Sequence, residues 1–307
     1  MYVRMTTGEQ AFRAGYVAIV GEPNVGKSTL LNALLKQKIS IVAKKPQTTR
    51  QRVLGILSDE HAQIIFLDTP GLLKPKYLLH ERMMRSAESA LQDADVILVM
   101  IDVSRGTELP EAVEQFVLKK FSSKPLFLVI NKVDTINRGE VLPMIAEFAK
   151  RNLFQEIFPI SALKKENLDD LTATISRTMP VHEPFYPTDI ISEQPERFFV
   201  AEFVREKIFE QFRDEIPYST AVEVQEFKER EAGKTFILAD IIVERDSQKG
   251  ILIGKNGDAL KNIGQRARKE IELFLDRPVF LELHVKVGEQ WRENEQWLKR
   301  LGYNPEG

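Results

Sequence analysis

The sequence predicts an α/β domain with a mostly parallel sheet, followed by a smaller α+β domain. Three observations indicate this arrangement. The chain has 307 residues, more than one ordinary core organises. Strand-like and helix-like runs alternate before residue 180, which is typical of a parallel sheet with helices on both faces. Prolines then interrupt residues 181–197, and the order of elements changes after them. We therefore expect domains at 1–180 and 198–307, joined by a linker at 181–197.

Short apolar runs predict the strands of the first domain. They are Tyr16–Val20, Val53–Leu57, Ile64–Leu67, Val96–Ile101, Leu126–Ile130 and Ile157–Ile160. Amphipathic runs between most of them predict helices over Ser28–Lys36, Leu79–Leu91, Leu109–Phe121, Glu140–Asn152 and Leu168–Met179. No helix-like run separates Val53–Leu57 from Ile64–Leu67, so this pair predicts an antiparallel hairpin at the sheet edge. Ligands of such folds bind at the carboxyl ends of the strands.

The second domain begins with a predicted helix over Phe198–Asp214. Its apolar face would consist of Val200, Phe203, Val204, Ile208 and Phe212. The remaining expected elements are strands at Ala221–Phe227 and Phe236–Val243 joined by a charged turn at Glu229–Lys234, a long helix from about residue 258 to Leu275, a strand at Val279–Val287, and a last helix around Trp291–Leu301. The α-β-β-α-α-β order predicts helices packed on one face of a three-stranded sheet.

Composition excludes several kinds of site. The 43% apolar and 29% charged content is that of a soluble globular protein. There is no cysteine, which excludes disulfides, thiolate zinc sites and thiol nucleophiles. The four histidines are scattered and lack metal-ligand spacing. No apolar run approaches the roughly 20 residues that span a bilayer. Residues Met1–Gly15 lack the apolar region of a secretory signal, so we expect a cytoplasmic protein.

Basic residues gather in one part of the second domain. Residues 181–307 hold 19 Lys and Arg against 25 Asp and Glu, which is net acidic. Within them, Arg245–Lys269 has seven basic residues against Asp246 and Asp258 alone. A basic island on an acidic background indicates a localised anionic partner. The alternative is an ordinary solvated helix face, and charge alone does not decide between the two.

Residues Gly21–Ser28 match the phosphate-binding pattern G-x-x-x-x-G-K-S between a predicted strand and a predicted helix. Their backbone N–H groups and the helix N-terminus favour bound phosphate. Lys27 would reach the β- and γ-phosphates, and the Ser28 hydroxyl would bind Mg²⁺. The whole candidate loop consists of Gly21, Glu22, Pro23, Asn24, Val25, Gly26, Lys27 and Ser28, with Thr29 following.

Asn131-Lys132-Val133-Asp134 indicates which base is bound. The Asp134 carboxylate can accept two parallel hydrogen bonds from N1–H and the 2-amino group of guanine. Adenine lacks this donor pair and would leave Asp134 unpaired, which discriminates by roughly 10⁴-fold or more. The stretch therefore predicts a guanine-nucleotide site.

Three shorter elements fall at places where they can complete that site. Asp68-Thr69-Pro70-Gly71 follows a strand, so that Asp68 can hold a Mg²⁺-bound water and the Gly71 N–H can contact the γ-phosphate. Ser161-Ala162 can place backbone N–H groups near guanine O6. Either Thr48 or Thr49 can complete Mg²⁺ coordination when the γ-phosphate is present, and the sequence does not choose between them. Taken alone, each element would also be consistent with an ordinary turn.

Gly254-Lys255-Asn256-Gly257 is a G-x-x-G element inside the basic island. Its glycines would let a single-stranded sugar–phosphate backbone approach closely, and Lys255 would meet a phosphate. Adjacent apolar residues would form the floor under exposed bases. The candidate RNA-binding residues are Ile251, Ile253, Gly254, Lys255, Asn256, Gly257, Lys261 and Arg268. A lone G-x-x-G is more often a plain turn, and its position in the island favours the functional interpretation.

Together these motifs resemble the TRAFAC-class, translation-factor-related GTPases, and G-x-P-N-V-G-K-S-T-L-L-N with D-T-P-G-L is similar to their Era-like branch. The second domain resembles a type II KH domain. The chain is identified as a member of the Era family, in which these two domains follow one another. The resemblance implies a P-loop GTPase that hydrolyses GTP to GDP with Mg²⁺. The catalytic residues that it implies are Asn24, Lys27, Thr49, Asp68 and Gly71, and the implied metal ligands are Ser28, Thr48 or Thr49, and Asp68.

The resemblance also implies binding near the 3′ end of small-subunit ribosomal RNA, a role in small-subunit maturation, a monomeric state and peripheral membrane association. No amphipathic anchor in the sequence requires the last property. Relatives with an Asn at the place of Asn24 are often stimulated by K⁺, which would add transition-state charge stabilisation. Leu72 stands where Ras-like enzymes have a water-orienting Gln, so we expect slow intrinsic hydrolysis. The alternatives are a related GTPase acting on tRNA or the large subunit, and an RNA-binding adaptor with little turnover.

Overall fold

The computed structural model describes residues 11–43, 45–229 and 233–304, and its larger sheet has the predicted architecture. This sheet has six strands in the order β2-β3-β1-β4-β5-β6. All neighbours are parallel except β2 and β3, which form the predicted antiparallel hairpin at the edge. The strands are β1 (Arg13–Gly21), β2 (Val53–Ser58), β3 (Ala62–Asp68), β4 (Val96–Asp102), β5 (Leu126–Asn131) and β6 (Glu156–Ile160). The expected fold class is confirmed.

Successive residues of the central strands enter two different cores. Val17 and Ile19 of β1 belong to one buried cluster, and Ala18 and Val20 to the other. This alternation follows from the two-residue period of a strand whose two faces are both covered. The covering helices are α1 (Lys27–Leu35), α2 (Leu78–Asp93), α5 (Arg138–Lys150) and α6 (Leu168–Thr178). A buried sheet of this kind fixes the strand ends that carry the candidate site.

One predicted helix of this domain differs in detail. The segment expected over Leu109–Phe121 begins at Glu111, after Pro110 in an extended conformation. It consists of α3 (Glu111–Val113), a π-type segment η2 (Glu114–Leu118) and α4 (Lys119–Phe121). The wider turn is local and keeps Val113, Val117 and Phe121 buried. Two short 3₁₀ turns, η1 (Val103–Arg105) and η3 (Val133–Thr135), follow β4 and β5.

The proline-containing linker packs along the edge strand instead of crossing open solvent. The Ile56 N–H of β2 donates to the Ile191 carbonyl at 2.8 Å. The Gln63 side chain donates to the Tyr186 carbonyl at 2.8 Å and accepts from the Phe185 N–H at 2.8 Å. The linker therefore satisfies part of the free edge of β2, a position where unpaired backbone groups would otherwise be exposed.

The second sheet has the predicted order of elements. Its strands run β7-β8-β9, with β7 antiparallel and β9 parallel to β8. The elements are α7 (Glu196–Gln211), β7 (Ala221–Lys228), β8 (Thr235–Val243), α8 (Asp246–Ile253), η4 (Lys255–Gly257), α9 (Asp258–Leu275), β9 (Val279–Val287), η5 (Trp291–Glu293) and α10 (Glu295–Arg300). Residues 230–232 of the predicted charged turn lie outside the described residues. So do residues 1–10 of Met1–Gly15, the stretch that lacks the apolar region of a secretory signal.

Two predicted helices in this domain differ from the structure. Helix α7 ends at Gln211, before the predicted end at Asp214, and begins at Glu196, inside the predicted linker. The last helix is divided: Trp291–Glu293 form a 3₁₀ turn, and α10 starts after Asn294. The Asn294 side chain accepts hydrogen bonds from the N–H groups of Gln296 and Trp297, which is an N-cap arrangement that sequence periodicity does not reveal.

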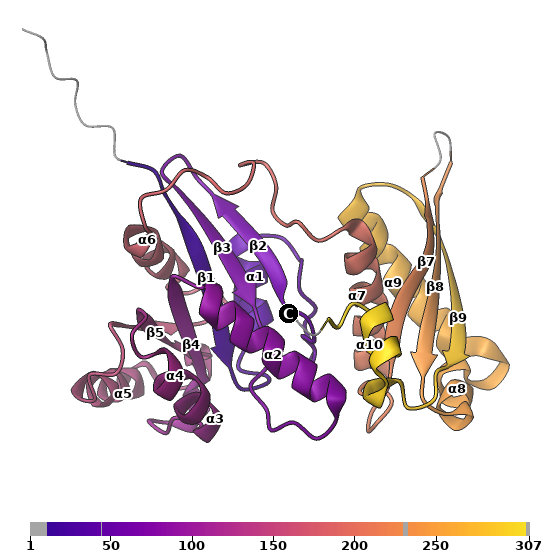
Figure 1. The fold of residues 1–307 in the computed structure, drawn as a ribbon, viewed down its shortest axis with the longest axis horizontal. Helices are drawn as coiled ribbons and strands as arrows, with labels where there is room; N and C mark the ends of the chain where they lie inside the picture. Colours follow the sequence, from indigo (N-terminus) through magenta and orange to yellow (C-terminus); the bar gives the residue numbers. More distant parts are fainter. Residues whose placement is uncertain (1–10, 44, 230–232, 305–307) are drawn as a thin grey trace, which may run out of the picture.

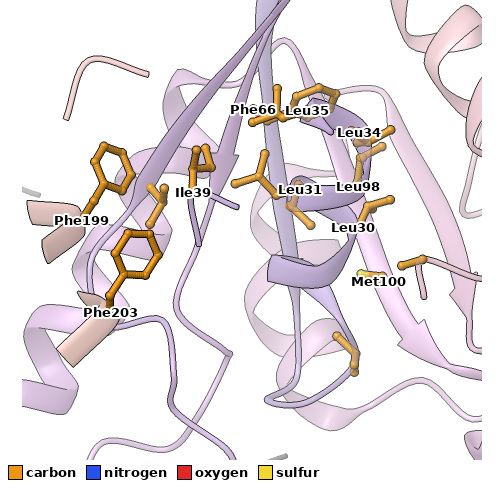
Figure 2. Packing of buried hydrophobic residues seen from close by; sticks show 14 of the residues in the cluster. Leu30, Leu31, Leu34, Leu35, Ile39, Phe66, Leu98, Met100, Phe199 and Phe203 are labelled. Atoms are coloured by element: carbon orange, nitrogen blue, oxygen red, sulfur yellow. The ribbon is translucent and has the colours of Figure 1, made fainter. Parts of the chain in front are cut away.

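The burial of α7 also differs from the single apolar face predicted for it. Phe199 and Phe203 are buried, and Figure 2 shows both rings directed toward Ile39 of the first domain. Arg205, Glu206 and Lys207 are buried as well, at 2%, 1% and 4% exposure. This helix packs against its own sheet and against the first domain, so both of its sides are covered. The two domains consequently share one continuous apolar cluster.

The buried charges of α7 are paired with residues 38–50 of the first domain. Glu206 accepts from the Val42 N–H at 2.9 Å and pairs with Lys38 at 2.6 Å. Arg205 donates to the Thr48 carbonyl, and Lys45 donates to the carbonyls of Phe209 and Phe212 at the end of the helix. These bonds fasten the segment that carries Thr48 and Thr49 to the second domain.

The C-terminal segment closes the boundary between the domains. Figure 1 shows α10 between the larger sheet and the smaller one. Trp291, Leu298 and Tyr303 form a third buried cluster with Leu79 and Met83 of α2. Arg82 of α2 pairs with Glu295 at 2.9 Å. Within the described ranges, no helix is both long enough and apolar enough to cross a membrane.

Candidate functional site

A pocket of about 600 Å³ lies at the carboxyl ends of the strands of the larger sheet. It is bounded by the loop after β1, the segment before β2, the turn after β3, and the turns after β5 and β6. Its lining residues are Pro23, Asn24, Gly26, Lys27, Ser28, Thr29, Ile41, Val42, Ala43, Gln47, Thr48, Thr49, Gly71, Asn131, Lys132, Asp134, Thr135 and Leu163. Most of the predicted nucleotide residues therefore lie around one cavity.

The loop after β1 has the backbone shape that a phosphate requires. Gly26 has φ 105°, and a side chain there would collide with the Asn131 amide. The Lys27 ammonium group lies over the loop, 3.2 Å from the Gly21 carbonyl and 3.0 Å from the Glu22 carbonyl. Burial lowers the pKa of Lys27 to about 8, although Asp68 and Glu22 favour its charged form. Phosphate oxygens in the pocket would supply a nearby negative charge.

Ser28 and Thr49 line the pocket, and the predicted Mg²⁺-site residue Asp68 lies directly behind them and outside the lining. The Ser28 hydroxyl donates to Asp68 Oδ2 at 2.8 Å and lies 2.9 Å from Thr49 Oγ1. Asp68 is fully buried, and among the described residues its Oδ1 has no hydrogen-bond partner. Burial raises the pKa of Asp68, against the effects of Lys27 and the neighbouring hydroxyls. Such oxygen donors with an unsatisfied carboxylate atom fit Mg²⁺.

The geometry separates the two threonines that the sequence left open. Thr49 is 6% exposed and its hydroxyl lies beside Ser28 and Asp68. Thr48 lines the pocket, and its carbonyl accepts from Arg205. Only Thr49 lies at the cluster of oxygens in this arrangement. Ser40, which sequence patterns did not indicate, also donates to Asp68 Oδ2 at 2.8 Å.

The turn after β3 lies against the phosphate loop. A side chain at Gly71 would come within 2.8 Å of the Pro23 backbone nitrogen, so only glycine allows this approach. The Leu72 N–H donates to the Gly21 carbonyl at 3.0 Å, and the Leu72 side chain is 2% exposed within the core. The residue after Gly71 therefore supplies a buried apolar group and no polar group.

Asn131 connects two loops of the base-binding region. Its amide nitrogen donates to the Val25 carbonyl at 2.7 Å, and its amide oxygen accepts from the Ala162 N–H at 2.9 Å. Lys132 pairs with Asp102 at 2.6 Å. The Asp134 side chain is exposed and lines the pocket. Asn131 therefore acts here through the loops that it holds, whereas Asp134 faces the cavity.

The turn after β6 carries the two backbone N–H groups that the sequence places near guanine O6. The Ser161 N–H donates to the Glu166 carbonyl, and the Ala162 N–H donates to Asn131, so both have acceptors within the protein. Leu163, the next residue, lines the pocket with 73% of its surface exposed. Sequence patterns missed Leu163 and also Ile41, Val42, Ala43, Gln47 and Thr135. Their only signal was proximity to the recognised motifs.

Glu22 and Val25, also predicted to bind the nucleotide, act within the loop in this structure. The Glu22 carboxylate pairs with Arg105, and its carbonyl accepts from Lys27. Val25 is 4% exposed, and its carbonyl accepts from Asn131. Neither side chain lines the pocket, so these residues shape the loop from outside the cavity.

A second groove, of about 390 Å³, lies on the smaller domain beside the G-x-x-G element. Gly254 has φ 72° and ψ 179°, and a Cβ there would lie 2.7 Å from the Ala259 Cβ. Lys255 and Asn256 are exposed at the tip, and Ile251 is 49% exposed nearby. The groove is lined by Gly257, Leu260, Lys261, Gly264, Gln265, Arg268, Leu281, Glu282 and Leu283. Its apolar side chains, Leu260 of α9 and Leu281 and Leu283 of β9, belong to no sequence motif and were not predicted.

The basic island divides between this groove and the boundary with α7. Lys261 and Arg268 line the groove, seven residues apart on α9 and hence on one side of the helix. Arg266 instead pairs with Glu210 of α7. Ile253 is partly buried against the core. The groove combines a close backbone approach, cationic side chains and an apolar floor, as a single-stranded nucleic acid requires.

Comparisons with known proteins match both domains. The family model described as a 50S ribosome-binding GTPase matches residues 16–132, and the KH domain model matches residues 215–292. The GTPase Era of Geobacter metallireducens is 48% identical over 298 residues, covering 96% of this chain and 99% of that protein. The chloroplastic GTPase ERA1 of Zea mays is 47% identical, covering 96% of this chain and 71% of that protein.

Two solved structures are similar over nearly the whole chain. They are a single-residue variant of Aquifex aeolicus Era bound to GDP·AlF₄⁻, and Era in complex with MgGDPNP and nucleotides 1506–1542 of 16S ribosomal RNA. Each has a TM-score of 0.91 and 48% identity, covering 95% of this chain and 99% of the other. With a nucleotide pocket, a G-x-x-G groove and relatives of this identity and coverage, the chain belongs to the Era family of GTPases.

Proposed function

We propose that this GTPase binds small-subunit ribosomal RNA near its 3′ end under the control of GTP, and assists maturation of the small ribosomal subunit. The observation that carries the proposal is the G-x-x-G groove in the same chain as the nucleotide pocket. The related complex with nucleotides 1506–1542 of 16S ribosomal RNA supports this class of RNA, at 48% identity over 95% of this chain. We further propose that the chain acts as a monomer in the cytoplasm.

We assign roles in the pocket from the positions of its side chains. The Asp134 carboxylate accepts from guanine, and Asn131 holds the loops on which the base rests. Lys27 places its charge against the β- and γ-phosphates. Ser28 and Thr49 provide hydroxyl ligands for Mg²⁺, and Asp68 acts through a bound water. When bound, Mg²⁺ offsets negative charge on the phosphate oxygens.

The same side chains suggest a slow intrinsic reaction. Hydrolysis transfers the γ-phosphoryl group of GTP to water and gives GDP and phosphate. Leu72 is buried and carries no group that could orient the attacking water. We propose that Asn24, in the phosphate loop with φ 66°, holds K⁺ beside the phosphates and so adds positive charge in the transition state.

Replacing Asp134 with Asn tests the guanine assignment. The amide loses the paired acceptor for N1–H and the 2-amino group and suits a 2-keto purine instead. We expect GTP affinity to fall roughly a hundredfold or more while affinity for xanthosine triphosphate rises. Fluorescence titration with both nucleotides measures the change, with thermal unfolding as the folding control. Unchanged GTP affinity would refute the assignment.

Separate substitutions of Thr48 and Thr49 by Ala distinguish the two threonines. Thr49→Ala removes a hydroxyl that lies 2.9 Å from Ser28 Oγ, and we expect the Mg²⁺ concentration needed for half-maximal hydrolysis to rise at least roughly tenfold. Thr48→Ala keeps the carbonyl that accepts from Arg205 and should have little effect. Thr49→Ser should restore activity. A larger defect in Thr48→Ala than in Thr49→Ala would reverse the assignment.

The proposed K⁺ role predicts a dependence on the monovalent cation. Hydrolysis should be faster in KCl than in NaCl at equal ionic strength, because K⁺ held beside Asn24 would add positive charge in the transition state. Asn24→Ala should abolish this difference without preventing nucleotide binding. Phosphate release measured in both salts gives the answer. If wild-type rates are equal, Asn24 only shapes the loop.

The double substitution of Lys255 and Asn256 by Asp tests the RNA groove. Two carboxylates would repel phosphates at the exposed tip, and we expect single-stranded RNA affinity to fall roughly tenfold or more at moderate salt, with a shallower salt dependence. GTP hydrolysis without RNA should be nearly unchanged, because neither side chain is buried.

The matched control replaces Lys150 and Asn152 with Asp. These residues are also exposed, Asn152 has φ 51° where Asn256 has φ 54°, and the charge change is the same. RNA affinity should be retained in this variant. Equal losses in the two double variants would mean that net charge, and not the G-x-x-G element, determines binding.

A further inference from the structure

A cavity of about 320 Å³ lies at the boundary between the domains, apart from both sites described above. Its walls come from residues that follow Thr49, from α2, from the linker and from the C-terminal segment. Arg50, Arg52 and Arg82 line it, together with Ser86 and Tyr303. Of the described residues in its lining, Glu193 alone carries a carboxylate. The lining therefore has an excess of positive charge, although Arg52 and Arg82 each pair with a carboxylate outside it.

Arg50 is buried, and no carboxylate of the described residues forms an ion pair with it. It is 3% exposed, and its guanidinium group donates to the carbonyls of Thr220, Pro217 and Tyr218 at 2.7 to 3.0 Å. The Phe209 and Trp291 rings also lie 5.9 and 5.8 Å from this group and favour its charged form. Carbonyls and rings stabilise the cation but carry no negative charge that would neutralise it. A buried, unneutralised charge is costly unless an anion lies near it.

Arg82 is the second observation and is independent of the first. It is 7% exposed, and its Nη2 donates to Glu295, a residue with 74% of its side chain exposed. Among the described residues, Nε and Nη1 of Arg82 have no hydrogen-bond partner although both atoms are buried. Unsatisfied buried donors of this kind are rare in native proteins, and an ordered water or an ion can satisfy them.

Arg52 completes the set at the more accessible part of the boundary. Its side chain is 30% exposed and pairs with Asp93, itself 53% exposed, so this ion pair is open to exchange with another anion. Guanidinium groups match the geometry of carboxylate and phosphate oxygens. A phosphate group presents more oxygens and more charge than a carboxylate, and so suits several arginines around one space.

We propose that this cavity binds the phosphate group of a small phosphorylated ligand, at a site distinct from the nucleotide pocket. The depth of burial of Arg50 and Arg82 favours a small ligand over a nucleic-acid strand, which needs an open path past the site. A bound phosphate would contact the residue that follows Thr49 and the helix that follows Gly71. It would therefore stabilise the present arrangement of the two domains.

Calorimetric titration with inorganic phosphate tests the site. The full-length protein is first saturated with Mg²⁺ and a non-hydrolysable GTP analogue, so that the phosphate positions of the nucleotide pocket are filled. We expect saturable phosphate binding, absent with chloride at the same ionic strength, and a higher unfolding temperature in phosphate. Absence of saturable binding to the wild type would overturn the proposal.

Four variants separate the site from the ion pairs around it. Arg82→Gln should weaken phosphate binding roughly tenfold, and Arg52→Gln should weaken it as well. Glu295→Gln removes the same ion pair as Arg82→Gln but keeps the guanidinium group, so binding should be retained or tightened. Arg85→Gln, at an exposed position of the same helix, should change nothing. Equal losses in Arg82→Gln and Glu295→Gln would assign Arg82 to the domain boundary alone.

Measuring the affinity of the same variants for single-stranded RNA distinguishes a small phosphorylated ligand from an RNA backbone. If Arg52→Gln weakens RNA binding while inorganic phosphate does not bind the wild type, the arginines contact RNA and the small-ligand proposal is wrong. If phosphate binding depends on Arg52 and RNA affinity does not, the proposal holds. Arg52 is suited to this arm because it is partly exposed, and its replacement does not leave a buried cavity.

Discussion

The rest of the structure depends on the double attachment of the segment from Lys38 to Arg50. On one side, Ser40 and Thr49 of this segment bond to Asp68 and Ser28 in the nucleotide pocket. On the other side, the Thr48 carbonyl accepts from Arg205, and the Val42 N–H donates to Glu206. Lys38 pairs with Glu206, and Lys45 donates to the Phe209 carbonyl near the end of α7. Neither attachment is local in sequence. The described residues of this segment, 38–43 and 45–50, form no helix or strand, so their conformation is set by the two surfaces that hold them.

This double attachment explains why a helix at the domain boundary can bury three consecutive charged residues. Isolated in the interior, Arg205, Glu206 and Lys207 would each carry a large desolvation penalty. Lys207 instead pairs with Glu206 at 2.9 Å and with Glu270 at 2.5 Å, and Lys38 bridges the same two carboxylates. Loss of one partner would leave an uncompensated buried charge. The network therefore favours one relative placement of the domains, in addition to the non-directional apolar contacts of Phe199 and Phe203.

The parts of the molecule that sequence predicted well are those with local rules. Strand runs, the hairpin at Val53–Leu67 and the α-β-β-α-α-β order all follow from periodicity, and the motifs that predicted the pocket lie at strand ends as a parallel sheet requires. The missed features are contacts between distant segments. Arg205–Lys207 looked like the polar side of an amphipathic helix, because nothing in their spacing shows a second packing surface. The proposed Mg²⁺ ligand is Thr49 and not Thr48 because the Thr49 hydroxyl lies beside Asp68. Two adjacent threonines look the same in the sequence, so only the fold distinguishes them.

Asn131 illustrates how a motif residue can be recognised correctly while its role needs the fold. The N-K-x-D pattern suggests a row of residues that contact guanine, yet Asn131 is 3% exposed and its amide is used by Val25 and Ala162. These bonds join the phosphate loop to the turn after β6, on opposite sides of β5. A Cβ at position 26 would lie 2.3 Å from the Asn131 amide nitrogen, so a larger residue at 26 would displace this amide. A smaller residue at 131 would remove it, and either change would disturb both loops. The carboxylate of Asp134, which we propose reads the base, thus depends on a buried amide three residues away. On this proposal the specificity of the pocket depends on the packing behind it as well as on the group that faces the ligand.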